Sequence, residues 1–160
     1  LQTEITTASN DIDRSLCLEL GASAVVNHRH PGWGEEVLRA AGGRAVERVI
    51  DVEFGANLGE ILNCIATSGV IASYSSSQVR EPQLPFLRMM YMDLTLRTVI
   101  VYAMPEAAKQ HAIEDITRAL TANVLKHRIA HRVPLEQLVQ SHQLIEHGGF
   151  GGCVVVDVQT

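Results

Sequence analysis

Two groups of polar and basic side chains near the start of the chain have the chemistry to bind a phosphate group. Each group directly follows a short β-rich run, TEITTA at residues 3–8 or AVVN at residues 24–27. Hydroxyl, amide and guanidinium groups donate hydrogen bonds to phosphate oxygens, and arginine can donate two in parallel. The predicted anion-binding residues are Ser9, Asn10 and Arg14 after the first run, and His28 and Arg29 after the second.

The first group also has a simpler interpretation. Ser9 and Asn10 form an ordinary N-cap signal for a following helix, and a cap can coexist with a phosphate contact. Asp11 and Asp13 add negative charge nearby and oppose anion binding, although acidic residues are favoured in the first turn of a helix for its dipole.

Further candidates end two later apolar runs. Tyr74, Ser75 and Ser76 close GVIASY, while Val101 and Tyr102 close the run from Leu94. Taken singly, such residues are more often structural than functional. Their position at the ends of predicted strands is what makes them candidates for ligand contact.

The elements that must position these residues alternate between strands and helices. We predict strands at residues 3–8, 24–27, 46–52, 69–74 and 94–102. The intervening segments repeat apolar residues every three or four positions, which predicts helices at about 11–20, 31–38, 58–66 and 105–124. A helix at about 135–146, a glycine-rich turn and a final strand at 153–158 complete the chain.

This alternation predicts crossover units, a parallel sheet and helices on both of its faces. The continuous apolar runs are typical of strands that are covered on both sides. Ligands of such sheets bind outside the carboxyl ends of the strands, so the candidate residues should gather along one edge.

Composition excludes several other classes of protein. Of 160 residues 46% are hydrophobic, the net charge is −5, and Lys109 and Lys126 are the only lysines, so a nucleic-acid partner is not expected. No apolar run is long enough to predict a membrane span. The widely spaced Cys17, Cys64 and Cys153 fit a reducing compartment rather than a disulfide framework, and we expect a cytoplasmic protein. No cysteine lies near the paired histidines, so no metal site is predicted.

A series of short motifs follows a fixed order along nearly the whole chain. The segments are TTAS at 6–9, LGA at 20–22, VVNHR at 25–29, AGGR at 41–44, VID at 49–51, TSGVI at 67–71, PLE at 134–136, SH at 141–142 and GGCVVVD at 151–157. This ordered series, rather than any one motif, resembles the zinc-free quinone oxidoreductases of the medium-chain dehydrogenase/reductase superfamily.

The resemblance implies an α/β fold, a partial Rossmann domain that lacks its first strand. In the family that strand is central, in the order 3-2-1-4-5-6, and a glycine-rich loop follows it. We therefore expect a gap between the two halves of the sheet. Residues 1–125 would be the C-terminal part of the nucleotide-binding domain. Residues 126–160 would return to the catalytic domain, so the strand at 153–158 should not extend the sheet beside residues 94–102.

The resemblance also implies hydride transfer from NADPH to a quinone or enone by a cytoplasmic homodimer. Ser9 stands where an acidic residue would bind the ribose 2′-hydroxyl of NAD, which favours NADP(H). Tyr74, Ser75 and Ser76 would face the nicotinamide ribose, and Val101 and Tyr102 would flank its ring. The alternatives are an enoyl reductase, a zinc-type alcohol dehydrogenase with its ligands outside this chain, and a nucleotide-binding or interaction module without turnover.

Overall fold

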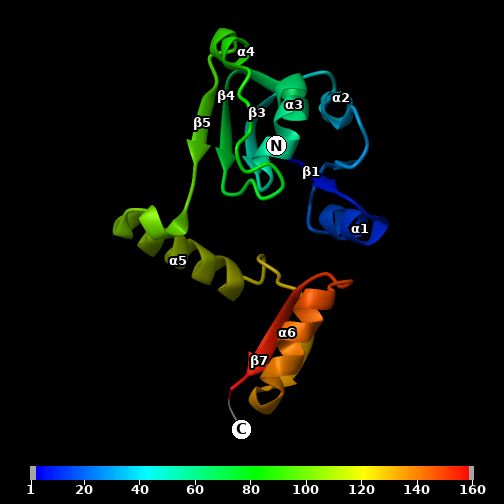
Figure 1. The fold of residues 1–160 in the computed structure, drawn as a ribbon, viewed down its shortest axis with the longest axis vertical. Coiled ribbons are helices and arrows are strands. Elements are labelled where there is room, and N and C mark those ends of the chain that lie inside the picture. The colour runs from blue at the N-terminus through cyan, green and yellow to red at the C-terminus, as the bar shows by residue number, and fades with distance from the viewer. Residues whose placement is uncertain (1–2, 159–160) are drawn as a thin grey trace. The chain divides into compact units, whose positions relative to one another are not determined.

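The computed structural model describes residues 3–158. They form two compact units, which divide between Met104 and Pro105. The first unit alternates strands and helices as the sequence predicts (Figure 1). Its elements are β1 (Ile5–Ala8), α1 (Asp11–Glu19), β2 (Ala24–Asn27), α2 (Trp33–Ala40), β3 (Val46–Asp51), α3 (Phe54–Cys64), β4 (Ile65–Ser73), α4 (Phe86–Tyr91), β5 (Thr95–Thr98) and the short 3₁₀ helix η1 (Val101–Ala103).

The strands of this unit form two parallel sheets, β1–β2 and β3–β4–β5. This is the order of a doubly wound sheet without its first, central strand. Among the described residues no strand pairs with both β1 and β3 to join the two sheets, so the expected gap is present. The partial Rossmann fold predicted from the sequence is confirmed.

One apolar core joins the halves on either side of the gap. It is built from β2, α2, α3 and β4, and Ile61 and Ile71 are completely buried in it. The Glu60 carboxylate of α3 also accepts hydrogen bonds of 2.8 Å from Gly32 N–H and 3.0 Å from Gly34 N–H at the start of α2. Packing of α2 on α3 therefore connects two sheets that share no described strand pairing.

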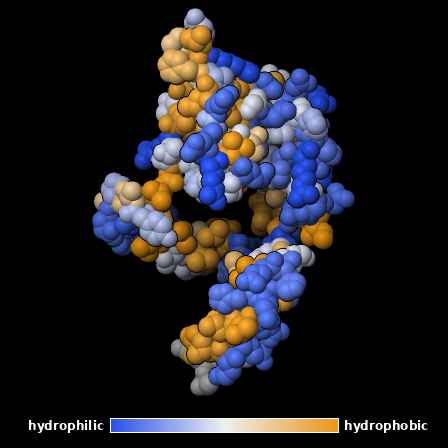
Figure 2. Space-filling model, viewed as in Figure 1, coloured by the Kyte–Doolittle hydropathy of each residue, from blue (hydrophilic) through white to orange (hydrophobic). Residues whose placement is uncertain are grey.

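Some apolar surface of this unit remains open. Ile50, on the other face of β3 from the core, is 83% exposed. Figure 2 shows apolar side chains gathered over α4, where Phe86, Leu87 and Met90 are exposed. The sequence predicts that helices cover both faces of the sheet. This cover is incomplete, because Ile50 of β3 is left exposed.

The second unit holds a small parallel pair of strands. Its elements are α5 (Glu106–Thr121), β6 (Ile129–Pro134), the 3₁₀ helix η2 (Leu135–Gln137), α6 (Leu138–His147) and β7 (Cys153–Asp157). β7 pairs with β6, and Arg132 and Asp157 join them through a 2.9 Å ion pair. The expectation that the last strand does not extend the main sheet is confirmed. The predicted boundary near residue 125 concerns the domains of a whole protein and stays a prediction.

Several predicted bounds were wrong. α3 begins at Phe54 rather than near Leu58, and β4 begins at Ile65 directly after it rather than at Gly69. β5 ends at Thr98, and the rest of the predicted strand 94–102 contains η1. Thr98 pairs with Ser73, the last residue of β4, and Val99 N–H donates a 2.8 Å bond to the Ser73 carbonyl oxygen, after which the described strand pairing ends. The helix α4 and the strand β6 were not predicted. No helix among the described residues combines the length and apolarity needed to cross a membrane.

Candidate functional site

The carboxyl ends of β1 and β2 enclose a polar pocket of ≈ 230 Å³. Its floor is the apolar end of the two strands, and its rim carries side chains of both charges. Asn10 and Arg14 line it, as the sequence led us to expect. The full lining is Ala8, Asn10, Asp11, Arg14, Val25, Val26, Asn27, His30 and Glu36.

Two of the predicted anion-binding residues are already held by local hydrogen bonds. Asn10 is the N-cap of α1: its carboxamide accepts a 2.9 Å bond from Asp13 N–H and donates a 2.8 Å bond to the Asp13 carboxylate. The Arg14 guanidinium donates a 2.9 Å bond to the Val25 carbonyl oxygen. That contact fixes the direction of Arg14 and leaves its other N–H groups for a ligand.

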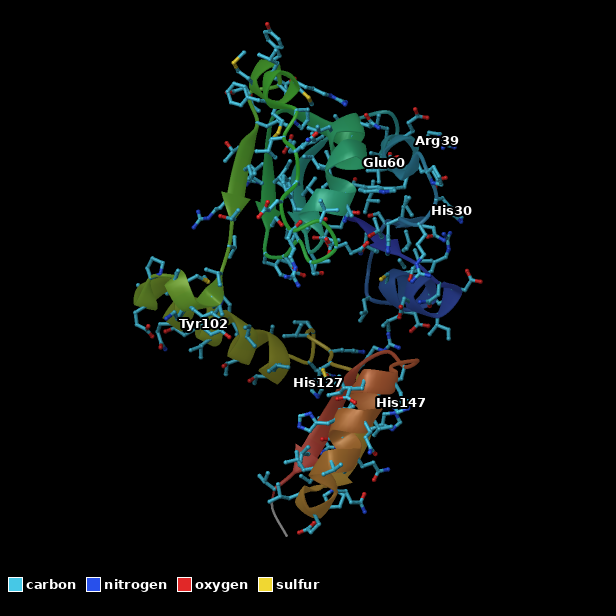
Figure 3. The ribbon with its side chains drawn as sticks, viewed as in Figure 1. His30, Arg39, Glu60, Tyr102, His127 and His147 are labelled. Carbon is cyan, nitrogen blue, oxygen red and sulfur yellow. The ribbon has the colours of Figure 1, made fainter. Side chains whose placement is uncertain are left out.

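The turn after β2 supplies the opposite wall of the pocket. The Asn27 carboxamide accepts a 3.0 Å bond from Arg29 N–H and lies 3.4 Å from His30 Nε2. Figure 3 shows His30 on this loop between β2 and α2. The side chains of His28 and Arg29 are exposed, and neither they nor Ser9 line the pocket. Asn27, His30 and Glu36 were missed, although His30 belongs to the His-Arg-His run that the sequence displays.

The second predicted group lies on the loop after β4, which passes over the start of α3. Tyr74 N–H donates to the Asp51 carbonyl oxygen at 3.2 Å, and Phe54 N–H donates to the Ser75 carbonyl oxygen at 3.1 Å. Ser76 Oγ accepts a 2.9 Å bond from Gly55 N–H. The ends of β3 and β4 are therefore tied together, as a ligand-binding edge requires.

Glu53 contributes the side-chain bonds to this loop. Its carboxylate accepts from Ser77 Oγ at 2.7 Å, from Ser77 N–H at 3.1 Å and from Gln78 N–H at 2.9 Å. The hydrogen bond from the Ser77 hydroxyl, followed by those from loop backbone N–H groups, holds the pKa of Glu53 below its ordinary value. No sequence signal pointed to this role.

Val101 and Tyr102 lie on η1 instead of at a strand end. Their side chains are 56% and 86% exposed, and Figure 3 shows Tyr102 on η1. The structure brings Tyr74, Ser75 and Ser76 onto one loop. It places no described contact between that loop and Tyr102, so the role of Val101 and Tyr102 stays a prediction.

The described residues do not fit a catalytic metal or a thiol nucleophile. No group of three or more His, Cys, Asp or Glu side chains in residues 3–158 is arranged to hold a metal ion. Burial raises the pKa of the Cys64 thiol to about 11, so this cysteine is protonated at neutral pH.

Comparison with known proteins gives one consistent result. A sequence model of the zinc-binding dehydrogenases matches residues 4–118. A quinone oxidoreductase of Pongo abelii is 21% identical over 145 residues, which is 89% of this chain and 43% of that protein. The chain therefore spans less than half the length of the curated relative that it matches.

Solved structures have the same fold. An NAD-dependent alcohol dehydrogenase superimposes with a TM-score of 0.79 at 27% identity, over 98% of this chain and 44% of that one. A mycobacterial protein crystallised with NADPH gives a TM-score of 0.79 at 20% identity, over 96% of this chain and 49% of that one. Among these neighbours, one is described as NAD-dependent and another was solved with NADPH.

Proposed function

Because the chain belongs to the zinc-binding dehydrogenase family, we propose that the full-length protein is a nicotinamide-dependent oxidoreductase, and that these residues form part of its cofactor-binding domain. The observation that carries the proposal is the polar pocket at the carboxyl ends of β1 and β2. In doubly wound sheets a cofactor lies outside this edge, with its adenosine end beside the strands that here are β1 and β2.

We propose NADP(H) as the cofactor. Ser9 has no carboxylate to bind the ribose 2′-hydroxyl of NAD or to repel a 2′-phosphate. Arg14 offers a fixed guanidinium in the pocket, and the exposed His28 and Arg29 add positive charge after β2. Asp11 and Glu36 line the same pocket, and their negative charge opposes binding of a phosphate. A preference for NADP(H) over NAD(H) therefore depends on Arg14, which would hold the 2′-phosphate away from these carboxylates.

At the other end of the cofactor, the loop after β4 would support the nicotinamide and its ribose. The exposed Tyr74 ring and the half-buried Ser75 and Ser76 belong to this loop. When bound, a reduced nicotinamide supplies a hydride, which together with a proton reduces a quinone to a hydroquinone or an activated alkene to its saturated product. The residues of this chain bind and orient the cofactor, and substrate contacts would come mostly from the rest of the protein.

Support for a quinone or enone substrate comes from the quinone oxidoreductase relative. No group of side chains in residues 3–158 is arranged to hold the zinc ion that the family name implies, and in a zinc-type alcohol dehydrogenase the ligands would lie outside this chain. An enoyl reductase uses the same hydride chemistry and is separated from a quinone reductase only by its substrate. The predicted homodimer is part of the same proposal.

The test uses the full-length protein. Oxidation of NADPH and NADH should be followed at 340 nm with a benzoquinone and with an enone, and reduction of NADP⁺ should be followed at the same wavelength with an alcohol. We expect quinone- or enone-dependent oxidation with a preference for NADPH. Cofactor binding by calorimetry without turnover of any substrate would instead support a nucleotide-binding module, and no binding of either cofactor would refute the proposal.

A further inference from the structure

Glu53 stands at the junction between the end of β3 and the start of α3, and its carboxylate is directed to the loop that follows β4. Both carboxylate oxygens are used. Oε2 accepts the two bonds from Ser77, and Oε1 accepts the bond from Gln78 N–H. Ser77 and Gln78 are exposed, and the described hydrogen bonds of their N–H groups are donated to the Glu53 carboxylate. The carboxylate is thus the side-chain anchor of this part of the loop.

The first turn of α3 adds a second attachment. Gly55 N–H donates to Ser76 Oγ at 2.9 Å. A Cβ built on Gly55 would lie 2.5 Å from the Val79 carbonyl oxygen and 2.8 Å from Ser76 Oγ, so only glycine permits this close approach. Gly55 therefore holds the loop at Ser76, and Glu53 holds it at Ser77 and Gln78.

The opposite end of the loop is attached through its backbone to β3 and α3. Tyr74 bonds to Asp51, and Ser75 bonds to Phe54. Asp51 is itself buried and accepts bonds from Glu53 N–H at 3.0 Å and Asn57 Nδ2 at 2.7 Å. The same short stretch of chain, from Asp51 to Gly55, thus sets the shape of the loop from Tyr74 to Val79.

We propose that Glu53 is a positioning residue, which holds the loop after β4 in the conformation that receives the nicotinamide end of the cofactor. The inference rests on the proposed function, and it deepens it by naming what fixes that half of the site. Glu53 need not touch the cofactor. It acts through Ser77 and Gln78 on Tyr74, Ser75 and Ser76, and its negative charge is already satisfied by three donors.

The proposal distinguishes the two ends of the cofactor. The pocket at β1 and β2 shares no lining residue with the loop that Glu53 holds. Loss of the Glu53 contacts should therefore weaken binding of a molecule that contains nicotinamide and spare binding of one that lacks it. A general loss of folded protein would weaken both equally.

The experiment measures dissociation constants of NADPH and of 2′-phospho-ADP-ribose, which lacks nicotinamide, for the full-length protein by calorimetry. The variants are Glu53→Gln, in which an amide NH₂ replaces one acceptor, and Ser77→Ala, which removes only the hydroxyl bond and keeps the fold accessible if the first variant is unstable. Glu60→Gln is the matched control. Glu60 also lies on α3, and its carboxylate also accepts two hydrogen bonds from backbone N–H groups. Its donors are Gly32 and Gly34 at the start of α2 instead of residues of the loop after β4.

We expect Glu53→Gln to raise the NADPH dissociation constant by about fivefold or more while that of 2′-phospho-ADP-ribose stays within about twofold. Ser77→Ala should change the same ratio by a smaller factor, and Glu60→Gln should leave the ratio unchanged. If both ligands weaken equally in Glu53→Gln and Ser77→Ala, or neither weakens, the positioning role is refuted while the proposed function stands. If the wild type binds neither ligand, the proposed function itself fails and the inference fails with it.

Discussion

The Arg14 guanidinium donates a 2.9 Å hydrogen bond to the carbonyl oxygen of Val25, across the carboxyl ends of β1 and β2. A basic side chain on a helix is thereby tied to the neighbouring strand, beside the pocket that we assign to the adenosine end of the cofactor. The contact links α1 to β2, and in the proposed complex Arg14 would also present positive charge to a phosphate.

Arg14→Ala should weaken binding of 2′-phospho-ADP-ribose to the full-length protein about tenfold, because a charge-assisted contact to phosphate is lost. Arg39→Ala is the control, since Arg39 is exposed on α2 and does not line the pocket. Calorimetric titration of both variants measures the effect. Equal affinities in the wild type and Arg14→Ala would remove Arg14 from the phosphate site.

Ser9→Asp should shift cofactor preference toward NADH, because the new carboxylate repels a 2′-phosphate and can accept a bond from a ribose hydroxyl. We expect the ratio of kcat/KM for NADPH over NADH to fall by roughly tenfold or more. The same change at Ser15, which is exposed on α1 and, unlike Ser9, does not directly follow the end of β1, provides the comparison. A ratio that moves equally in both variants would exclude Ser9 as a determinant of specificity.

Two glycines of α3 should respond in opposite ways to alanine. A Cβ at Gly55 would overlap the Val79 carbonyl and Ser76, and forcing extra volume into a packed site costs about 1–3 kcal/mol. A Cβ at Gly59 meets nothing within 4 Å, so Gly59→Ala should stabilise the protein by about 0.4–1 kcal/mol through the unfolded chain. Urea unfolding of the two variants tests the pair, and a stable Gly55→Ala would contradict the described approach of the loop.

Glu60 should make stability depend on pH. Hydrogen bonds from Gly34 N–H and Gly32 N–H hold its pKa below the ordinary value. A carboxyl with a lowered pKa in the folded state stabilises above its unfolded pKa, and that contribution is lost as the pH falls through the folded value. The melting temperature of the wild type should therefore fall more steeply below about pH 4.3 than that of Glu60→Gln.

Thermal scans between neutral and acidic pH, with Glu36→Gln as a second carboxyl control, check this prediction. Glu36 has no described hydrogen bond to the start of α2, so its substitution should leave the pH dependence near that of the wild type. Parallel curves for the wild type and Glu60→Gln would mean that the contact to α2 does not contribute.

The sequence predicted that each core element of the first unit exists, although it gave α3 and β4 the wrong bounds, and it missed the exposed α4. β2 has the expected bounds because AVVN is a continuous apolar run next to a clear turn. The missed α4 is too short for a helical repeat to be visible, and β6 carries His131 and Arg132 in the middle of its run. β5 ended early because β4 itself ends at Ser73, which still accepts a bond from Val99 N–H and leaves no residue of β4 for the chain after it.

The candidate site shows the same division. Asn10 and Arg14 could be found because they lie at the N-cap and in the first turns of the helix that follows β1, and polar or basic groups close to a strand end are a readable signal. Glu36 reaches the pocket from a helix that begins after an intervening turn, and Glu53 acts on a loop 24 residues away. Both roles depend on which segments the fold brings together, and local patterns do not encode that.

The gap between β1 and β3 has a consequence for cooperativity. With no described backbone pairing across it, protection against hydrogen exchange in β1–β2 cannot be inherited from the three-stranded sheet. It must come through α2, whose attachment to α3 includes the two bonds to Glu60. Residues 3–40 should therefore unfold locally, as a separate cooperative unit, at a lower free energy than β3 and β4. Binding of a molecule across both sheets would join these two parts of the chain into one cooperative unit.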